Sequence, residues 1–149
     1  MTDSSAGVVP HHTAAANDVI NVVAVTTTKF ELIPQKYDGT PVFGGILQNS
    51  HSADYTTALG DANKHQLHPL ADNNPRTFTI DSNANVPYQI GTAITFVNEI
   101  NTLTIAITAD TMKLAGAGTT GSRTLAVNGI ATAIKTDTAT WWISGTALT

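Results

Sequence analysis

The sequence predicts an all-β protein, in which a small β-sandwich or barrel domain (about residues 50–149) follows an extended N-terminal arm with a β segment. Short runs of Val, Ile, Thr and aromatic residues recur, separated by Gly, Asn, Asp and Pro. In residues 102–108, Leu and Ile alternate with Thr and Ala, as in a strand with one buried face. Helical periodicity is nearly absent, and the one short candidate, residues 53–64, has too few apolar positions for an amphipathic helix.

The first 49 residues form the predicted arm and linker. Residues 19–33 have the composition of a strand, and residues 19–25 are apolar on both faces. An exposed run of this kind promotes aggregation, so we expect it to be covered by a sheet or by a partner. Prolines and glycines then interrupt the pattern and predict a linker near residues 34–50.

The second part of the chain contains strand patterns at about ten-residue spacing, which is typical of a sandwich or barrel. Asn128-Gly129 is a pair favoured in two-residue type I′ hairpins, and it separates two of these patterns. The predicted strands are residues 77–80, 91–98, 102–108, 124–127, 130–135 and 140–143. The predicted core residues are Ile94, Phe96, Leu103, Ile105, Ile107, Leu125, Val127 and Ile134.

Composition excludes several classes of function. Charged residues make up 12% of the chain, about half the usual share, and the net charge of −4 leaves no basic stripe for nucleic acid. No apolar run approaches the roughly 20 residues that span a bilayer, and the N-terminus lacks the pattern of a signal peptide, so we expect no membrane association and synthesis in a cytoplasm. The absence of cysteine excludes disulfides and thiolate metal sites. A surface this poor in charge is expected to be covered in part by partner chains.

The sequence indicates no enzyme, cofactor or small-molecule substrate. Residues 116–121 spell GxGxxG, but a strand pattern follows where a dinucleotide site requires a helix, so the run predicts a turn. No nucleophile elbow and no positioned carboxylate pair are present.

Three histidines, His51, His65 and His68, lie near aspartates and could supply a metal site of mixed ligands. They lack the fixed helical spacing of zinc sites, so we interpret them as surface or interface residues and predict no metal.

Trp141 and Trp142 are neighbours in a predicted strand, so one is expected in the core and the other outside. The outward tryptophan could stack on a sugar or fill a subunit interface. No further aromatic residues lie nearby to support sugar binding, so core and interface packing is the preferred interpretation.

Short motifs along residues 50–149 occur in the order found in a C-terminal module of tailed-bacteriophage structural proteins, and this part of the chain resembles that module. Asn63 stands where the family tends to have Gly. The matching segments are Tyr55-Thr56-Thr57-Ala58-Leu59, Asp61-Ala62-Asn63-Lys64, residues 77–80, Pro87 to Ile94, Leu103-Thr104-Ile105, residues 113–121, residues 131–135 and Trp142 to Thr146.

The resemblance implies a virion structural protein, and we expect a capsid decoration (cement) protein on the outer surface of the head. Its partners would be the major capsid protein and itself, as a homotrimer that stabilises the capsid by binding across seams between capsomers. A short head or tail fibre for display or host attachment is the alternative, and a carbohydrate-binding module is a second one. The predicted capsid or subunit interface residues are Val19, Ile20, Val22, Val23, Val25, Phe30, Leu32, Trp141 and Trp142.

Overall fold

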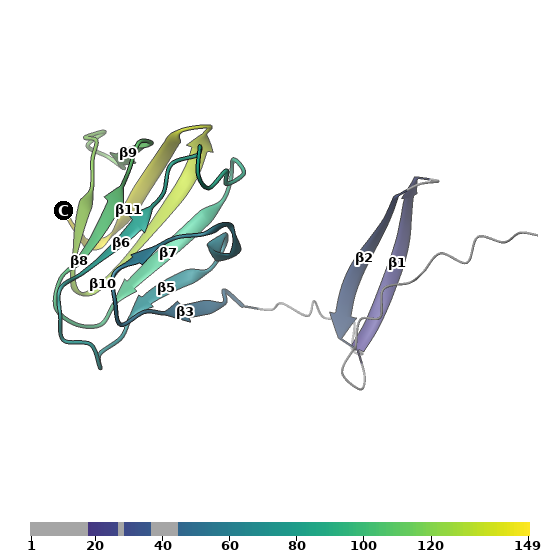
Figure 1. Cartoon of the computed structure of the whole chain (residues 1–149), viewed down its shortest axis with the longest axis horizontal. Helices are drawn as coiled ribbons and strands as arrows, with labels where there is room; N and C mark the ends of the chain where they lie inside the picture. The colour runs from purple at the N-terminus through teal and green to yellow at the C-terminus, as the bar shows by residue number, and fades with distance from the viewer. Residues whose placement is uncertain (1–17, 27–28, 37–44) are drawn as a thin grey trace, which may run out of the picture. The chain divides into compact units, whose positions relative to one another are not determined.

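A computed structural model describes residues 18–26, 29–36 and 45–149, and it is all-β, with 51% of the chain in strands. The chain divides into two compact units, Met1–Gly45 and Ile46–Thr149. In the first unit, β1 (Asp18–Thr26) and β2 (Lys29–Lys36) form an antiparallel pair (Figure 1). The strand pattern of residues 19–33 is therefore divided between two paired strands.

The second unit is a β-solenoid of about three turns, so the prediction of a sandwich or barrel was wrong. From β3 to β8, successive strands belong alternately to two sheets. Each strand from β3 to β6 pairs with the strand two places further along the chain. β3, β5 and β7 pair in parallel in one sheet, and β4, β6 and β8 pair in parallel in the other. The coil strands are β3 (Gln48–Ser50), β4 (Tyr55–Thr56), β5 (His65–His68), β6 (Arg76–Ile80), β7 (Ala93–Asn98) and β8 (Leu103–Ile107).

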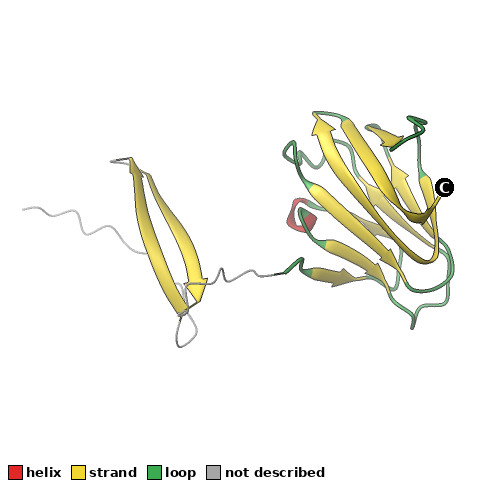
Figure 2. Cartoon of the chain, turned by 180° about the vertical axis from the view of Figure 1, so that it is seen from behind, coloured by secondary structure: helices red, strands yellow, loops and turns green. Residues whose placement is uncertain are grey.

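Three further strands close the end of the solenoid: β9 (Thr111–Leu114), β10 (Arg123–Asp137) and β11 (Thr140–Leu148). The first residues of β10 pair antiparallel with β8, and its later residues pair antiparallel with β7. One strand therefore joins both sheets, and β11 extends the surface by pairing with β10 and, in parallel, with β9. Figure 2 shows how completely strands dominate this unit; the one helical turn, Leu59–Asp61, lies between β4 and β5.

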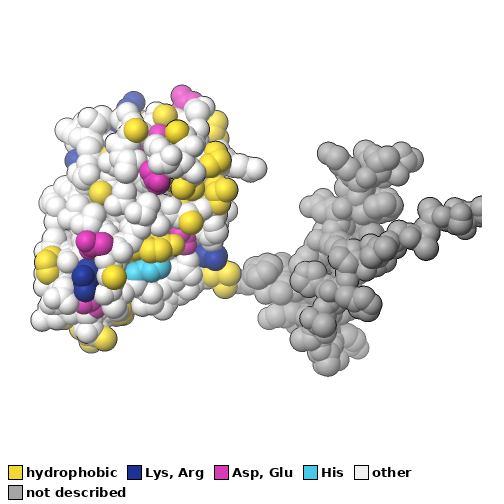
Figure 3. All heavy atoms as spheres, in the orientation of Figure 1, with side chains coloured by type: hydrophobic (Ala, Val, Ile, Leu, Met, Phe, Trp, Pro, Cys, Tyr) yellow, Lys and Arg dark blue, Asp and Glu magenta, His cyan; other side chains and the backbone are white. Residues whose placement is uncertain are grey.

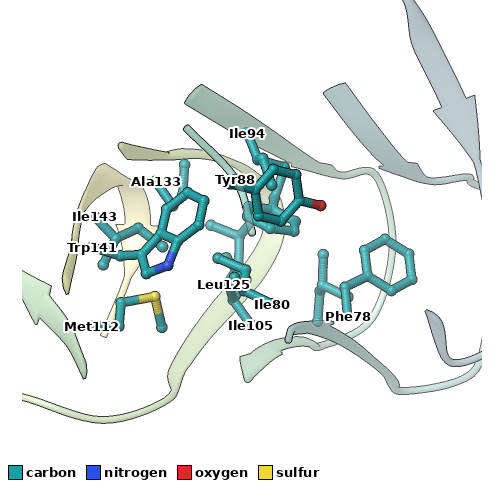
Figure 4. Close-up of a cluster of buried hydrophobic side chains, with 13 residues drawn as sticks. Phe78, Ile80, Tyr88, Ile94, Ile105, Met112, Leu125, Ala133, Trp141 and Ile143 are labelled. Atoms are coloured by element: carbon teal, nitrogen blue, oxygen red, sulfur yellow. The ribbon is translucent and has the colours of Figure 1, made fainter. Parts of the chain in front are cut away.

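The core fills the space between the two sheets with side chains from alternate positions of the strands. In Figure 4, Trp141, Ile143, Met112 and Ala133 gather at one end, Phe78 lies at the other, and Ile80, Ile105 and Leu125 lie between them. The buried set is Phe78, Ile80, Tyr88, Ile94, Phe96, Leu103, Ile105, Met112, Leu125, Ala131, Ala133, Trp141 and Ile143.

Asn128-Gly129 does not form the predicted hairpin, because β10 runs through both residues without reversing. Asn128 has a positive φ of 62°, and the pairing register of β10 shifts between Leu125 and Ile130. A Cβ on Gly129 would lie 2.5 Å from Cδ1 of Leu125, so only glycine fits there. The pair instead produces an irregularity where β10 leaves β8 and joins β7.

Two predicted core residues of β10 are on the surface: Val127 is 47% exposed and Ile134 is 45% exposed, so their assignment to the core was wrong. Val127 lies at the irregularity, where the strand leaves the regular pattern. Ile134 faces outward because the alternation that starts at Leu125 continues along β10, with Ala131, Ala133 and Lys135 pointing inward. Of the other predicted core residues, Ile107 is half-buried and the remainder are buried: Ile94, Phe96, Leu103, Ile105 and Leu125.

We expect Ile105→Ala to destabilise the protein by about 2–5 kcal/mol, because Ile105 is fully buried in β8 and its removal leaves a cavity. Urea denaturation of the full-length chain measures the change. Ile90→Ala is the matched control, since Ile90 is 64% exposed, and we expect a change within about 0.5 kcal/mol. Equal effects of the two substitutions would contradict the assigned faces of β8.

Candidate functional site

The outward surface of β7, β10 and β11 is the broadest regular face near the closed end of the solenoid. The pairing register places residues from the three strands side by side: Ile134 lies between Ala93 and Trp142, and Thr132 lies between Thr95 and Ser144. We call this surface the outer face, and its members are Ala93, Thr95, Val97, Ile130, Thr132, Ile134, Trp142, Ser144 and Thr146.

Three large apolar side chains of the outer face are open to solvent. Ile130 is 51% exposed, Ile134 is 45% exposed and Trp142 is 39% exposed. Nζ of Lys113, on the neighbouring strand β9, lies 5.6 Å from the centre of the Trp142 ring. Ile134 and Trp142 are direct neighbours, and Ile130 lies two outward positions away along β10 beyond Thr132. Exposed large apolar side chains on one face are typical of interaction surfaces.

The outer face contains no carboxylate and no basic residue, and its remaining members are small or carry hydroxyl groups. The hydroxyl oxygens of Thr95 and Thr132 are 2.9 Å apart, so the two groups form a hydrogen bond between β7 and β10. Figure 3 shows one side of this unit, where acidic and basic side chains are few and the largest group of them lies toward its left edge. The outer face itself can be covered by another protein without burying a charge, whereas a partner that covers Trp142 must also accommodate the ammonium group of Lys113 at its border.

The two tryptophans lie on opposite sides of β11, as the alternation predicts. Trp141 is fully buried and packs edge-on against Tyr88, with ring centres 5.5 Å apart, whereas Trp142 belongs to the outer face. The remaining predicted interface residues lie on β1 and β2, and their side chains fall outside the described part of the structure. These are Val19, Ile20, Val22, Val23, Val25, Phe30 and Leu32.

Sequence reasoning missed Ile130 and Ile134 as members of the outer face. Ile134 was expected in the core because Asn128-Gly129 was interpreted as a hairpin. In the strand after it, the residues that face outward were therefore taken as the buried ones. The direct neighbour of Ile134 on β11 is Trp142, so the outward tryptophan was the available signal. Using Trp142 as this signal requires knowledge of the pairing register between β10 and β11.

The GxGxxG run forms the turn between β9 and β10, as predicted. Gly116, Gly118 and Gly121 all have positive φ, and β10 follows directly. A dinucleotide site would need a helix at this point to direct backbone N–H groups at the phosphates.

The three histidines form separate hydrogen bonds. His51 stacks on Tyr55, with ring centres 3.6 Å apart, and Nε2 of His65 lies 3.0 Å from Oε1 of Gln48. His68 is buried, and its ring nitrogens lie 2.8 Å from Oδ1 of Asn98 and 2.9 Å from the carbonyl oxygen of Asp72. Over residues 45–149, no three His, Asp or Glu side chains come together as a set of metal ligands.

Asp72 and Arg76 stabilise the loop between β5 and β6. Nε of Arg76 donates to Oδ2 of Asp72 at 2.6 Å, and its Nη2 donates to Oδ1 at 3.0 Å, so the contact is bidentate. Asn74 donates a further hydrogen bond to Oδ1. These hydrogen bonds, with that of Arg76 the largest cause, lower the pKa of Asp72 from 3.8 to about 2. Together they anchor the loop that leads from one sheet to the other.

Comparisons with known proteins supply no relative, because no family model, curated protein or solved structure matches this chain. Among the described residues, no helix has the length and apolar character needed to cross a bilayer. The outer face is therefore interpreted from its own geometry.

The lowered pKa of Asp72 predicts how its contribution to stability changes with pH. A carboxylate with a lowered pKa in the folded state stabilises the fold above the unfolded value of 3.8, and this contribution is lost as the pH falls through about 2. We expect Asp72→Asn to melt below the wild type at about pH 6, with the difference shrinking between about pH 4 and about pH 2. Melts followed by circular dichroism measure it. Asp137→Asn, at an exposed position, is the control, and a constant difference for Asp72→Asn over this range would contradict the pKa assignment.

Proposed function

We propose that this chain is a structural protein of a tailed-phage virion, which binds the outer surface of the head and stabilises the capsid as a decoration protein. The observation that carries the proposal is the outer face, whose own residues carry no charge and which has three exposed large apolar side chains. Its chemistry suits assembly with other protein chains, with the charge of Lys113 at its border.

The outer face suits contact between copies of the same chain. Each copy carries a net charge of −4, so copies repel unless they meet through a surface that is free of charge. Ile130 at one end and Ile134 with Trp142 at the other then supply the apolar groups of the contact. The row of Thr95, Thr132 and Ser144 between them supplies hydroxyl groups. We propose a homotrimer, in which each solenoid contacts its neighbours through this surface.

The motif residues of the phage resemblance lie in turns and strands of the solenoid. Asn63, the departure from the glycine of the family, has a positive φ of 60°, a conformation that asparagine and glycine both adopt readily. The departure therefore preserves the turn before β5. Residues 77–80, Leu103-Thr104-Ile105 and residues 131–135 lie in β6, β8 and β10, so the motifs correspond to the coil strands and to the strand that closes them.

Capsid stabilisation would follow from the division of the chain into two units. The first unit, with β1 and β2, provides the attachment to capsid subunits, and the solenoids hold the copies together. Once one attachment forms, the others bind at high effective concentration, so a trimer spans a seam more tightly than one chain can. Binding to the closed shell alone stabilises that shell by mass action.

A short fibre is the second candidate, because the same two-unit division provides a peg and a displayed domain. The two functions differ in what the virion loses without the protein: a decoration protein affects the stability of the head, and a fibre affects adsorption to the host. The carbohydrate-binding alternative has less support, since Trp142 is the single aromatic residue of the outer face.

Removing the gene from the phage tests the proposed function. We expect the deleted virions to release their genome at a lower temperature and after milder osmotic shock, and to adsorb to host cells normally. The control is the same phage with the gene restored in trans. Normal head stability with lost adsorption would replace the decoration function with the fibre.

The double variant Trp142→Ala, Ile134→Thr tests the role of the outer face in assembly. Central apolar residues of an interface each contribute about 2 kcal/mol or more, so we expect self-association to weaken by at least about 30-fold. Sedimentation velocity over a range of concentrations measures it. Ile90→Ala removes a similarly exposed apolar side chain outside the outer face and is expected to leave association unchanged. A wild-type chain that stays monomeric throughout would refute the homotrimer.

A further inference from the structure

Lys135 occupies a position in which lysine is rarely found. It follows Ala131 and Ala133 in the inward row of β10, and its side chain is only 1% exposed. Lysine is almost never fully buried unless a carboxylate accompanies it. Neither of the ion pairs found among the described residues includes Lys135.

The amino group of Lys135 instead contacts a carboxamide. Its Nζ lies 2.7 Å from Oδ1 of Asn83, in the loop that follows β6, and 5.5 Å from the centre of the Trp141 ring. Trp141 is fully buried and Tyr88 packs edge-on against it, so apolar rings surround one side of the contact. The contact is therefore shielded on the side of Trp141, whereas Asn83 is half-buried.

A carboxylate lies near this contact. Asp110 is 8% exposed, and its Oδ1 accepts a hydrogen bond from the backbone N–H of Asn83 at 3.0 Å. Its Oδ2 accepts one from Nε1 of Trp141 at 3.4 Å. Asp110 thus holds the backbone of Asn83 and the ring of Trp141 in place, and both of these residues contact Lys135.

We propose that Lys135 and Asn83 form an intramolecular isopeptide bond in the folded protein. After the ammonium group of Lys135 has lost a proton, its Nζ attacks Cγ of Asn83, forming a new C–N bond. A second proton then passes from Nζ to Nδ2 of Asn83. The Cγ–Nδ2 bond then breaks and ammonia leaves, so the products are a secondary amide and one molecule of ammonia. No oxidant and no cofactor is required.

The fold supplies the proximity that this reaction needs. In solution an amine and a carboxamide do not react at a useful rate, but groups held near their attack distance gain a large effective concentration. The 2.7 Å contact between Nζ and Oδ1 places the nucleophile next to the carbonyl carbon. The reaction is therefore expected only after β10 has closed the solenoid.

The product would explain why the protein retains a buried lysine. A secondary amide is neutral, so bond formation removes the cost of holding an ammonium group away from water. It also joins two positions 52 residues apart, which restricts the unfolded chain as a disulfide does. The chain has no cysteine, so this would be a covalent cross-link formed without thiol chemistry. The inference does not depend on the proposed function.

The intact mass of the purified full-length protein tests the proposal. We expect a mass below that of the sequence by one ammonia, together with a branched peptide after proteolysis that joins the segments containing Asn83 and Lys135. Asn83→Ala and Lys135→Arg should both have the full mass of their sequences. A wild-type protein with its full mass after prolonged incubation in the folded state would overturn the proposal.

Two further outcomes have defined meanings. Loss of ammonia without the branched peptide, or its persistence in Lys135→Arg, would mean cyclisation at another asparagine and would also overturn the proposal. The lowered mass and the branched peptide both require a covalent bond. A hydrogen bond between Lys135 and Asn83 would produce neither.

Discussion

The parallel stacking of the coils, closed by one long strand, is the constraint on which the rest of the structure depends. Strands of successive coils are in register, so like positions lie above one another: Phe78 pairs with Ile105, and His68 pairs with Asn98. The last coil would leave two open sheet edges, and β10 pairs with both of them. An unpaired edge invites aggregation, so this strand completes the fold and protects it.

The same strand determines where the chemistry of the molecule lies. Successive side chains of β10 point to opposite sides, so its inward row brings Lys135 to Asn83 and its outward row brings Ile130 and Ile134 to the outer face. The inward row begins at Leu125 and continues through Ala131, Ala133 and Lys135. A shift by one residue would exchange the two rows, burying the isoleucines and exposing the lysine.

Much of the local structure could be predicted from the sequence. Alternation identified the coil strand of residues 102–108, and it assigned Ile94, Phe96 and Leu103 to the core, because a half-buried strand needs that pattern whichever strand it pairs with. It could not distinguish a solenoid from a sandwich, since parallel and antiparallel neighbours require the same alternation. The short strands β3, β4, β5 and β9 also went unpredicted, because a few residues provide too little periodicity.

The candidate sites were less predictable than the strands. The prediction that one of Trp141 and Trp142 is buried and the other faces outward was correct, because it needed only the alternation within one strand. Membership of the outer face depends on register between strands, and the contact of Lys135 with Asn83 joins residues far apart in the chain. Neither is encoded in any short window of sequence.

A reconstruction of the virion that carries this chain tests the central claim most directly. The account predicts solenoids grouped around symmetry axes on the outer surface of the head, with Trp142 directed toward the neighbouring copy and the first unit in contact with capsid subunits. Solenoids found singly, or at the tail with the outer face open to solvent, would contradict it.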